Sequence, residues 1–220
     1  MKRLAIPELL DTDAGTPTEV QASLADLSMV NRWFGGASTM CSLVERVASE
    51  TSRRQLCFLD IGGATGDVPA FMQERLAGRG IRLDAVVLDR ALTHMHRKLP
   101  PVAADAMHLP FADNGFDLVG SSLFIHHFEP DEVVKLTNEC LRVCRMAVLI
   151  NDLRRSPVHL ALVYAGFPLY RSRLTRHDAP ASIRRAYTLG ELRSMLQQTA
   201  ASRIDLSTHY LYRMGAIVWK

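Results

Sequence analysis

The sequence predicts a Rossmann-like α/β fold: a doubly wound, seven-stranded sheet, mostly parallel with one antiparallel strand near the C-terminus, preceded by an N-terminal helical cap. Three observations support this prediction. Apolar runs such as 56–61 and 118–123 are continuous, as in strands covered on both faces. Helical stretches separate these runs, and a glycine-rich turn follows the first one. The length of 220 residues, 48% of them apolar, suits one globular domain.

The N-terminal quarter is predicted to be helical after a flexible arm. Residues 1–18 contain prolines and a glycine without apolar periodicity, which predicts a loose arm without functional residues. Apolar residues then recur at helical spacing within 20–34 and 40–47, so residues 19–53 are expected to form a helical cap or lid. The turn between these helices is expected to fold over a ligand, with Trp33 or Phe34 excluding water.

Residues 54–220 are predicted to form the sheet domain. Strands are expected at 56–61, 85–88, 102–104, 118–123, 147–150, 204–208 and 216–219. Helices are expected at 69–76, 91–99, 133–144 and 189–199. The short connection 210–215 favours a hairpin between the last two strands, which makes one strand antiparallel.

Charge and cysteine content argue against several classes of protein. The 26 basic and 23 acidic residues leave a net charge of +3, too small to indicate a nucleic acid as partner. The four cysteines form no Cys-x-x-Cys pair, so a reducing, cytoplasmic location is expected. No apolar run approaches the roughly 20 residues of a membrane span. The pairs His94/His96 and Cys140/Cys144 lack two further ligands nearby, so no metal is expected.

The most informative segment is LDIGGATGD, residues 59–67, where a predicted strand runs into a glycine turn and a helix. Gly62 and Gly66 allow a tight bend and a close approach of the backbone to a ligand. The full Gly-x-Gly-x-x-Gly pattern of a pyrophosphate site is absent, and Asp60 and Asp67 flank the turn. Two carboxylates disfavour a diphosphate and attract an ammonium or sulfonium group, so a cationic ligand is expected.

Two further acids follow the next two predicted strands. Asp89 lies 23 residues after Gly66, where its carboxylate can accept hydrogen bonds from ribose hydroxyls. Asp105 can accept a hydrogen bond from the exocyclic amine of adenine, and the Ala106 amide can donate one to a ring nitrogen. Together with Asp60, these acids predict a nucleoside cleft at the carboxyl ends of the strands.

Together with VVLDRA, AADAMHLPFADNGFDLV and SSLFIHHFEPDE further along the chain, the LDIGGATGD segment resembles the class I S-adenosylmethionine-dependent methyltransferases. The resemblance is greatest to their small-molecule, ubiquinone-pathway-like branch. The resemblance covers residues 54–152 well, although Ala64 stands where a middle glycine is usual. It implies S-adenosylmethionine as cofactor, with its methionine part at the glycine loop and at the backbone carbonyl of Ser121. The expected cofactor-binding residues are Arg32, Asp60, Gly62, Gly63, Gly66, Asp89, Arg90, Asp105, Ala106 and Ser121.

Acid–base candidates follow the fourth and fifth predicted strands, where the resemblance places the methyl acceptor. Neutral phenols have a pKa near 10, so a general base helps their methylation. Successive residues of an extended chain point in opposite directions, so only one of His126 and His127 is expected to reach the cleft. His127 is the expected catalytic base, and Asp152 is expected to orient its ring or the substrate hydroxyl. His126 is the other catalytic candidate, and it is structural if His127 is the histidine that reaches the cleft. Alternatively, His127 bonds a helix end and Asp152 caps the next helix.

The predicted activity is methyl transfer to a small-molecule acceptor, most of all O-methylation of a phenolic or related natural-product hydroxyl. The fold commonly inserts an acceptor-binding segment at about 153–187, which here holds seven arginines and one aspartate. This charge suits an acidic acceptor, a carrier protein or a coenzyme A thioester, or it is a solvated face. Interleaved aromatic residues suit an aromatic acceptor or core packing.

Three alternative functions stay open. The first is C- or N-methylation, and the second is a nucleoside-binding pseudo-enzyme with a pericyclase-like role. The third is an NAD(P) oxidoreductase, against which stand the missing Tyr-x-x-x-Lys pair and the more than fifty residues before the first predicted strand.

Overall fold

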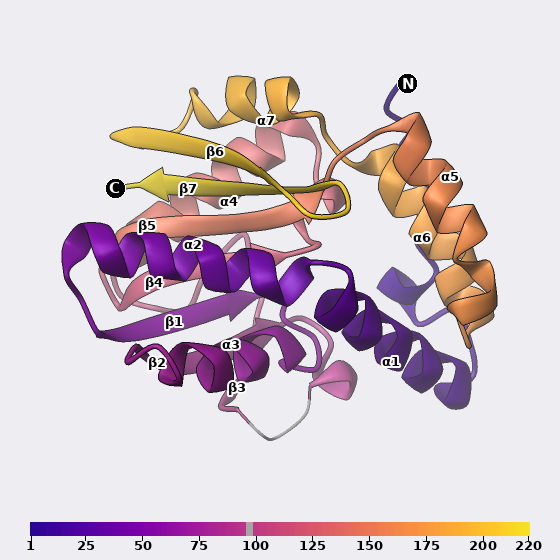
Figure 1. Cartoon of the computed structure of the whole chain (residues 1–220), viewed down its shortest axis with the longest axis horizontal. Helices are drawn as coiled ribbons and strands as arrows, with labels where there is room; N and C mark the ends of the chain where they lie inside the picture. Colours follow the sequence, from indigo (N-terminus) through magenta and orange to yellow (C-terminus); the bar gives the residue numbers. More distant parts are fainter. Residues whose placement is uncertain (96–98) are drawn as a thin grey trace.

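A seven-stranded sheet forms the centre of the computed structural model, which describes residues 1–95 and 99–220. The strands follow the order β3-β2-β1-β4-β5-β7-β6 (Figure 1). Strand β7 runs antiparallel to both of its neighbours, and the other pairs are parallel. The predicted fold class, including its single antiparallel strand, is confirmed. The strands are β1 (Gln55–Ile61), β2 (Arg82–Asp89), β3 (Pro101–Ala103), β4 (Phe116–Ser122), β5 (Cys144–Leu153), β6 (Arg203–His209) and β7 (Arg213–Trp219).

Helices cover both faces of this sheet. Helices α2 (Gly36–Thr51) and α3 (Asp67–Ala77) share one buried apolar cluster with strand residues such as Phe58. Helices α4 (Pro130–Val143) and α7 (Leu189–Leu196) belong to a second cluster on the opposite face. Because both faces are buried, the parallel strands need apolar side chains at successive positions, which explains the continuous apolar runs of the sequence.

A third group of helices stands beyond the carboxyl ends of the parallel strands, at the right of Figure 1. This group, called the cap from here on, consists of α1 (Pro17–Trp33), α5 (Pro157–Ala165) and α6 (Arg173–Arg185), with the 3-10 turns η1 (Leu10–Thr12) and η4 (Phe167–Leu169). Of the predicted cap at 19–53, only α1 belongs to this group. Helix α2 lies on the sheet instead, because its apolar stripe, including Met40 and Val44, is buried there.

The segment before α1 is packed against the cap, so the prediction of a loose arm at residues 1–18 is wrong. The Leu9 and Leu10 amides donate hydrogen bonds to the Asp178 carboxylate at 2.8 and 3.0 Å. Arg3 donates to both carboxylate oxygens of Glu129, at 3.0 and 2.8 Å. These contacts join positions more than 120 residues apart in sequence, and no local pattern carries that information.

Local structure differs from the prediction after β2 and in the last hairpin, among other places. The predicted helix at 91–99 is described only as the 3-10 turn η2 (Leu92–His94), and residues 96–98, with His96, lie outside the described residues. The predicted hairpin between the last two strands is confirmed, but β7 begins at Arg213 rather than at residue 216. Leu211 and Tyr212 adopt left-handed φ values of 52° and 60°, so the turn forms without glycine.

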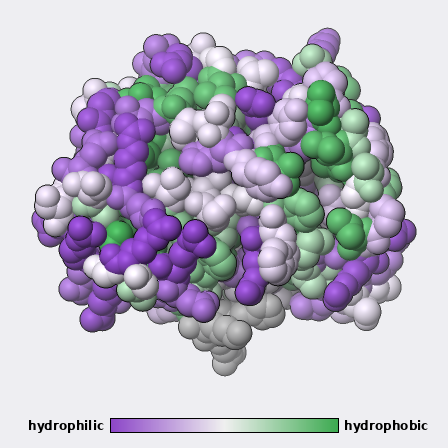
Figure 2. Space-filling view, viewed as in Figure 1, coloured by the Kyte–Doolittle hydropathy of each residue, from purple (hydrophilic) through white to green (hydrophobic). Residues whose placement is uncertain are grey.

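Among the described helices, none is long and apolar enough to cross a membrane. Exposed apolar side chains do occur on α5, where Val158 and Leu162 are 55% and 46% exposed. Figure 2 shows apolar residues gathered at the right of the molecule, over this helix.

Candidate functional site

A cavity of about 680 Å³ lies between the carboxyl ends of the parallel strands and the cap. One part of its wall follows β2 and β3 and includes Asp89, Arg90 and Asp105. Another part is formed by the turn after β4, by α5 and α6, and by Arg213 at the start of β7. A second cavity, of about 20 Å³, lies beneath the glycine turn. The carboxyl ends of parallel strands are where α/β sheets bind their ligands.

The glycine turn after β1 is shaped by close contacts that exclude larger side chains. Gly62 has a φ of +64°, and a Cβ there would lie 2.4 Å from the Phe124 ring. A Cβ on Gly63 would lie 2.5 Å from the Asp60 carboxylate. Gly62 lines both cavities and Gly63 lines the smaller one. Gly66, with a φ of +71°, is the N-cap residue before α3 and lines neither cavity.

Three carboxylates gather around this turn. Asp60 is 1% exposed, and its Oδ1 has no hydrogen-bond partner among the described residues. Burial and the neighbouring Asp67 and Asp89 carboxylates raise the pKa of Asp60 well above its usual range. A buried carboxyl oxygen without a partner costs free energy, so the arrangement favours a ligand that brings a cation or a hydrogen-bond donor.

Asp89 and Asp105 line the larger cavity beside this turn. The Asp89 carboxylate accepts hydrogen bonds from the Ala64 and Ala91 amides, both at 2.9 Å, which fix its orientation. Asp105 accepts a hydrogen bond from the Met107 amide at 2.9 Å. The acids that the sequence places after three successive strands therefore do meet at one edge of the sheet.

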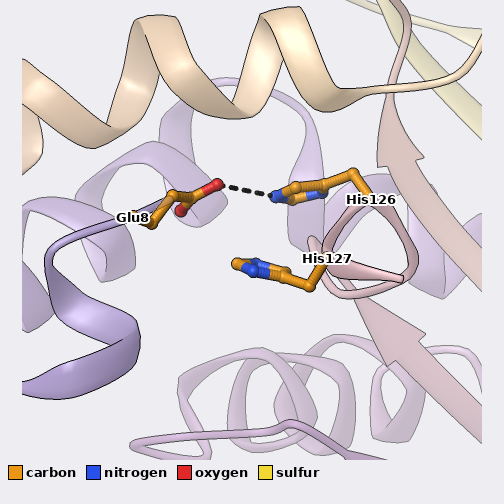
Figure 3. A group of neighbouring side chains, drawn as sticks. All are labelled: Glu8, His126 and His127. Atoms are coloured by element: carbon orange, nitrogen blue, oxygen red, sulfur yellow. Dashed lines mark ion pairs between the residues drawn. The ribbon is translucent and has the colours of Figure 1, made fainter. Parts of the chain in front are cut away.

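His126 and His127 both line the larger cavity, on the 3-10 turn η3 (Ile125–His127). Their ring centroids lie 4.3 Å apart (Figure 3). The prediction that only one of them reaches the cleft is wrong, because opposite side-chain directions hold for a strand and not for a 3-10 turn. The predicted pairing is also wrong. Asp152 Oδ1 lies 2.7 Å from His126 Nδ1, whereas His127 Nδ1 lies 3.2 Å from Asp11 Oδ2.

His126 is a buried imidazole between two carboxylates. Its Nε2 lies 3.4 Å from Glu8 Oε1, an ion pair without hydrogen-bond geometry (Figure 3). Burial alone would lower the pKa of His126, but the Asp152 and Glu8 carboxylates outweigh it and raise that pKa to about 10. Burial alone would raise the pKa values of Glu8 and Asp152, and the His126 charge holds both below their usual range. At neutral pH the three groups therefore form a charged triad.

Glu8 and Asp11 are site residues that the sequence reasoning missed. Glu8 is 8% exposed and also accepts a hydrogen bond from the Ser182 hydroxyl at 2.8 Å. Glu8, His126 and His127 bring one ligand atom each within 4.8 Å of one another. In the charged triad His126 keeps both ring protons, so it offers no lone pair to a metal ion.

The comparisons with known proteins fit this geometry. Residues 59–149 match the family model described as a methyltransferase domain. This chain therefore contains a methyltransferase domain, with a class I fold. The predicted family, enzyme class and cofactor, S-adenosylmethionine, are confirmed. No curated protein sequence matches the chain.

Three solved structures illustrate how widely this fold is shared. The plantazolicin methyltransferase BpumL, in complex with a desmethylPZN analog and SAH, is 14% identical with a TM-score of 0.66, covering 90% of this chain and 89% of that chain. An Aquifex aeolicus SAM-dependent methyltransferase is 13% identical with a TM-score of 0.59, covering 93% and 98%. A candidate O-methyltransferase of Nostoc punctiforme is 15% identical with a TM-score of 0.62, covering 93% and 60%.

The site of the methyltransferase fits its cofactor on two observations. The partnerless Asp60 oxygen and the added Asp67 and Asp89 charges suit the ammonium and sulfonium groups, and the glycines leave room beside them. Ala64, which stands where a glycine is usual, adopts a φ of 42°, in the left-handed region that favours glycine. When bound, S-adenosylmethionine supplies an activated methyl group.

Three predicted cofactor residues, Gly66, Arg32 and Ser121, line neither cavity of the described chain. Arg32 is exposed, and its guanidinium lies 5.7 Å from the centre of the Trp33 ring. Its neighbour Asn31 lines the smaller cavity instead. Ser121 is buried, while Ser122, the next and last residue of β4, lines both cavities, because successive residues of a strand point in opposite directions. Of the two expected lid residues, Phe34 lines the larger cavity and Trp33 is 68% exposed.

Several arginines of the 153–187 segment are committed to contacts within the chain. Arg155 donates hydrogen bonds to the Ala186 carbonyl and to Glu191. Arg185 donates to the His127 carbonyl at 2.8 Å, and Arg176 to the Tyr170 carbonyl at 3.0 Å. These guanidinium groups stabilise the cap and the turn that carries the two histidines. The net charge of the segment is therefore larger than the positive charge that is available to a partner.

Proposed function

We propose that the methyltransferase transfers a methyl group from S-adenosylmethionine to a hydroxyl group of a small aromatic acceptor bound beside the histidine turn. One observation carries this proposal: a single cavity joins Asp89 and Asp105 with His126 and His127. Methyl transfer is an in-line displacement, so the donor and acceptor must lie in one continuous space. The likeness to a candidate O-methyltransferase agrees with this reaction class.

The proposed cofactor roles divide along the edge of the sheet. Asp60, in the smaller cavity, attracts the ammonium group of the methionine part. Asp89 accepts hydrogen bonds from the ribose hydroxyls with the lone pairs that its amide contacts leave free. Asp105 and the Ala106 amide bind the adenine edge at the far wall of the larger cavity.

His127 is the proposed proton acceptor, with Asp11 in place of Asp152 as its orienting carboxylate. The 3.2 Å contact with Asp11 Oδ2 keeps a proton on His127 Nδ1, which leaves the Nε2 lone pair for the acceptor hydroxyl. His126 is unsuited to this step, because Asp152 and Glu8 already hold it as an imidazolium. Its proposed role is to fix the turn that carries His127.

General-base assistance of this kind contributes about 10²- to 10⁴-fold in rate. His127→Ala should therefore lower kcat with an ordinary phenol by at least about tenfold. The affinity for S-adenosylhomocysteine should stay within twofold, because His127 lies on the acceptor side of the cavity. The acidity of the acceptor distinguishes a lost base from a structural defect. The fall in kcat of His127→Ala should be smaller for phenols that are already ionised at the assay pH, because these need no base.

The test is transfer of a labelled methyl group to a panel of phenols, with mass-spectrometric assignment of the methylated atom. His209→Ala is the matched control, since His209 lies on β6 and lines neither cavity. O-methylated products that depend on His127 would support the proposal. Products methylated only on carbon or nitrogen, or no transfer to any hydroxyl, would overturn it.

A further inference from the structure

Arg213 is a buried cation that the proposed reaction leaves unused. It is the first residue of β7, it is 1% exposed, and it lines the larger cavity. Its Nε donates a hydrogen bond to the Phe34 carbonyl at 3.3 Å. Neither Nη1 nor Nη2 has a hydrogen-bond partner among the described residues. The two outer nitrogens of the guanidinium fork are therefore buried and unpartnered within the described chain, in a side chain that lines the cavity.

Such a group needs an anionic partner. Burial lowers the pKa of Arg213 to about 10, which still leaves the guanidinium charged at neutral pH. Asp152 is the nearby acid that would stabilise this charge, but its oxygens accept hydrogen bonds from His126 Nδ1 and from the His126 and Leu153 amides. An unpaired buried charge is strongly unfavourable, so the free fork favours a ligand with a negative group.

The position of Arg213 in the sheet indicates which ligand supplies that group. Arg213 pairs with Leu153 in the β5–β7 register, and β4 and β5 stand between β7 and β1. The proposed cofactor contacts lie on the other side, after β1, β2 and β3. The anion thus belongs to the acceptor side of the cavity.

The surroundings of the guanidinium suit an aromatic ring. Phe34, Tyr170 and His159 line the same cavity, and the charge of Arg213 acts on both Tyr170 and His159. A carboxylate accepts two parallel hydrogen bonds from a guanidinium fork, a geometry that a single neutral oxygen does not match. Aromatic side chains beside such a fork can contact the ring that carries the carboxylate.

We propose that Arg213 binds the carboxylate of the methyl acceptor, so that the acceptor is a hydroxylated aromatic acid. The assignment to the acceptor rests on the function proposed above. The methionine part of the cofactor also carries a carboxylate, and the experiment separates these two sources of the same chemistry.

The first arm measures binding by titration calorimetry on enzyme saturated with S-adenosylhomocysteine. Sodium benzoate and neutral, isosteric benzamide are the probes. The wild type should bind benzoate at least tenfold more tightly than benzamide. Arg213→Met should abolish this preference, while Arg213→Lys, which keeps the charge but not the fork, should retain part of it. Arg203→Met, at the first position of neighbouring β6 and away from the cavity, is the matched control.

The melting temperature shows whether a loss of binding in Arg213→Met comes from a loss of folded structure. Because the free fork is unpaired, Arg213→Met should leave the melting temperature unchanged or raise it. Equal binding of both probes by the wild type, or a benzoate preference that survives in Arg213→Met, would overturn the proposal. A weaker affinity of Arg213→Met for S-adenosylhomocysteine would also overturn it, because the fork would then serve the cofactor.

The second arm measures methyl transfer to hydroxybenzoates and to the matching hydroxybenzamides. The wild type should favour the acids in kcat/KM by at least tenfold, and Arg213→Met should lose this preference because its kcat/KM falls far more for the acids than for the amides. Methylation of both classes without preference would overturn this inference and leave the proposed function standing. Failure to methylate either class, with Arg213-dependent benzoate binding, would refute the proposed function and keep the anion site.

Discussion

Replacement of Asp152 by asparagine tests whether the buried triad stabilises the fold. The Asp152 carboxylate accepts three hydrogen bonds: from His126 Nδ1 at 2.7 Å, from the His126 amide at 3.1 Å and from the Leu153 amide at 2.6 Å. Asparagine keeps the shape of the side chain but has one carbonyl oxygen and no charge. In Asp152→Asn, the His126 ring loses its closest anionic partner in a site where both residues are fully buried.

The magnitude follows from the desolvated charge. Removal of one partner of a buried ion pair costs about 3 to 5 kcal/mol, because the remaining charge is left uncompensated. Glu8 still faces His126 Nε2 at 3.4 Å, so we expect the lower part of this range, about 3 kcal/mol. For a domain of this size, 1 kcal/mol corresponds to about 2 to 4 °C in melting temperature. The variant should therefore melt about 6 to 12 °C below the wild type.

Calorimetric melting and urea unfolding at pH 7 measure this effect. Asp113→Asn provides the control, because Asp113 pairs with Arg142 on the surface and its side chain is 68% exposed. That variant should lose less than about 1 kcal/mol. If Asp152→Asn melts within 2 °C of the control, the buried triad does not stabilise the fold, and our account of His126 as a charged positioning residue is refuted.

Three further predictions concern the cofactor side and the cap. Gly63→Ala should weaken binding of S-adenosylhomocysteine at least tenfold in a calorimetric titration, because the new Cβ would lie 2.5 Å from Asp60; unchanged affinity would remove this turn from the site. Asp89→Ala should weaken the same binding by about 1 to 3 kcal/mol through lost hydrogen bonds to a charged group, and wild-type affinity would contradict the ribose assignment. Burial lowers the pKa of His159 to about 4. Between about pH 6.5 and 4, His159 is therefore protonated in the unfolded chain and neutral in the folded chain. Stability should fall by up to about 3 kcal/mol as the pH drops through this window, and His159→Gln should remove that part of the decrease in urea unfolding; parallel pH curves of variant and wild type would contradict it.

Local sequence patterns predicted the architecture and the cluster of acids at one edge of the sheet. Continuous apolar runs predict buried parallel strands, because a strand that helices cover on both faces needs apolar side chains at successive positions. The glycine turn and the acids at 60, 89 and 105 follow from the same logic, since the carboxyl ends of successive parallel strands meet at one edge. The start of β7 was predicted at the wrong residue, because Leu211 and Tyr212 form the turn before it and no glycine marks this turn in the sequence.

By itself, the sequence determined the sheet, its single antiparallel strand and the three acids that lie along the carboxyl edge of the parallel strands. Only the tertiary structure decided which groups meet on the acceptor side. Glu8 and Asp11 reach the histidines across more than 110 residues of chain, and Arg213 becomes a cavity residue only when β7 pairs with β5. The reason is physical: periodicity records which face of an element is buried, whereas the partner of a lone charged side chain depends on long-range packing that leaves no repeat in the chain.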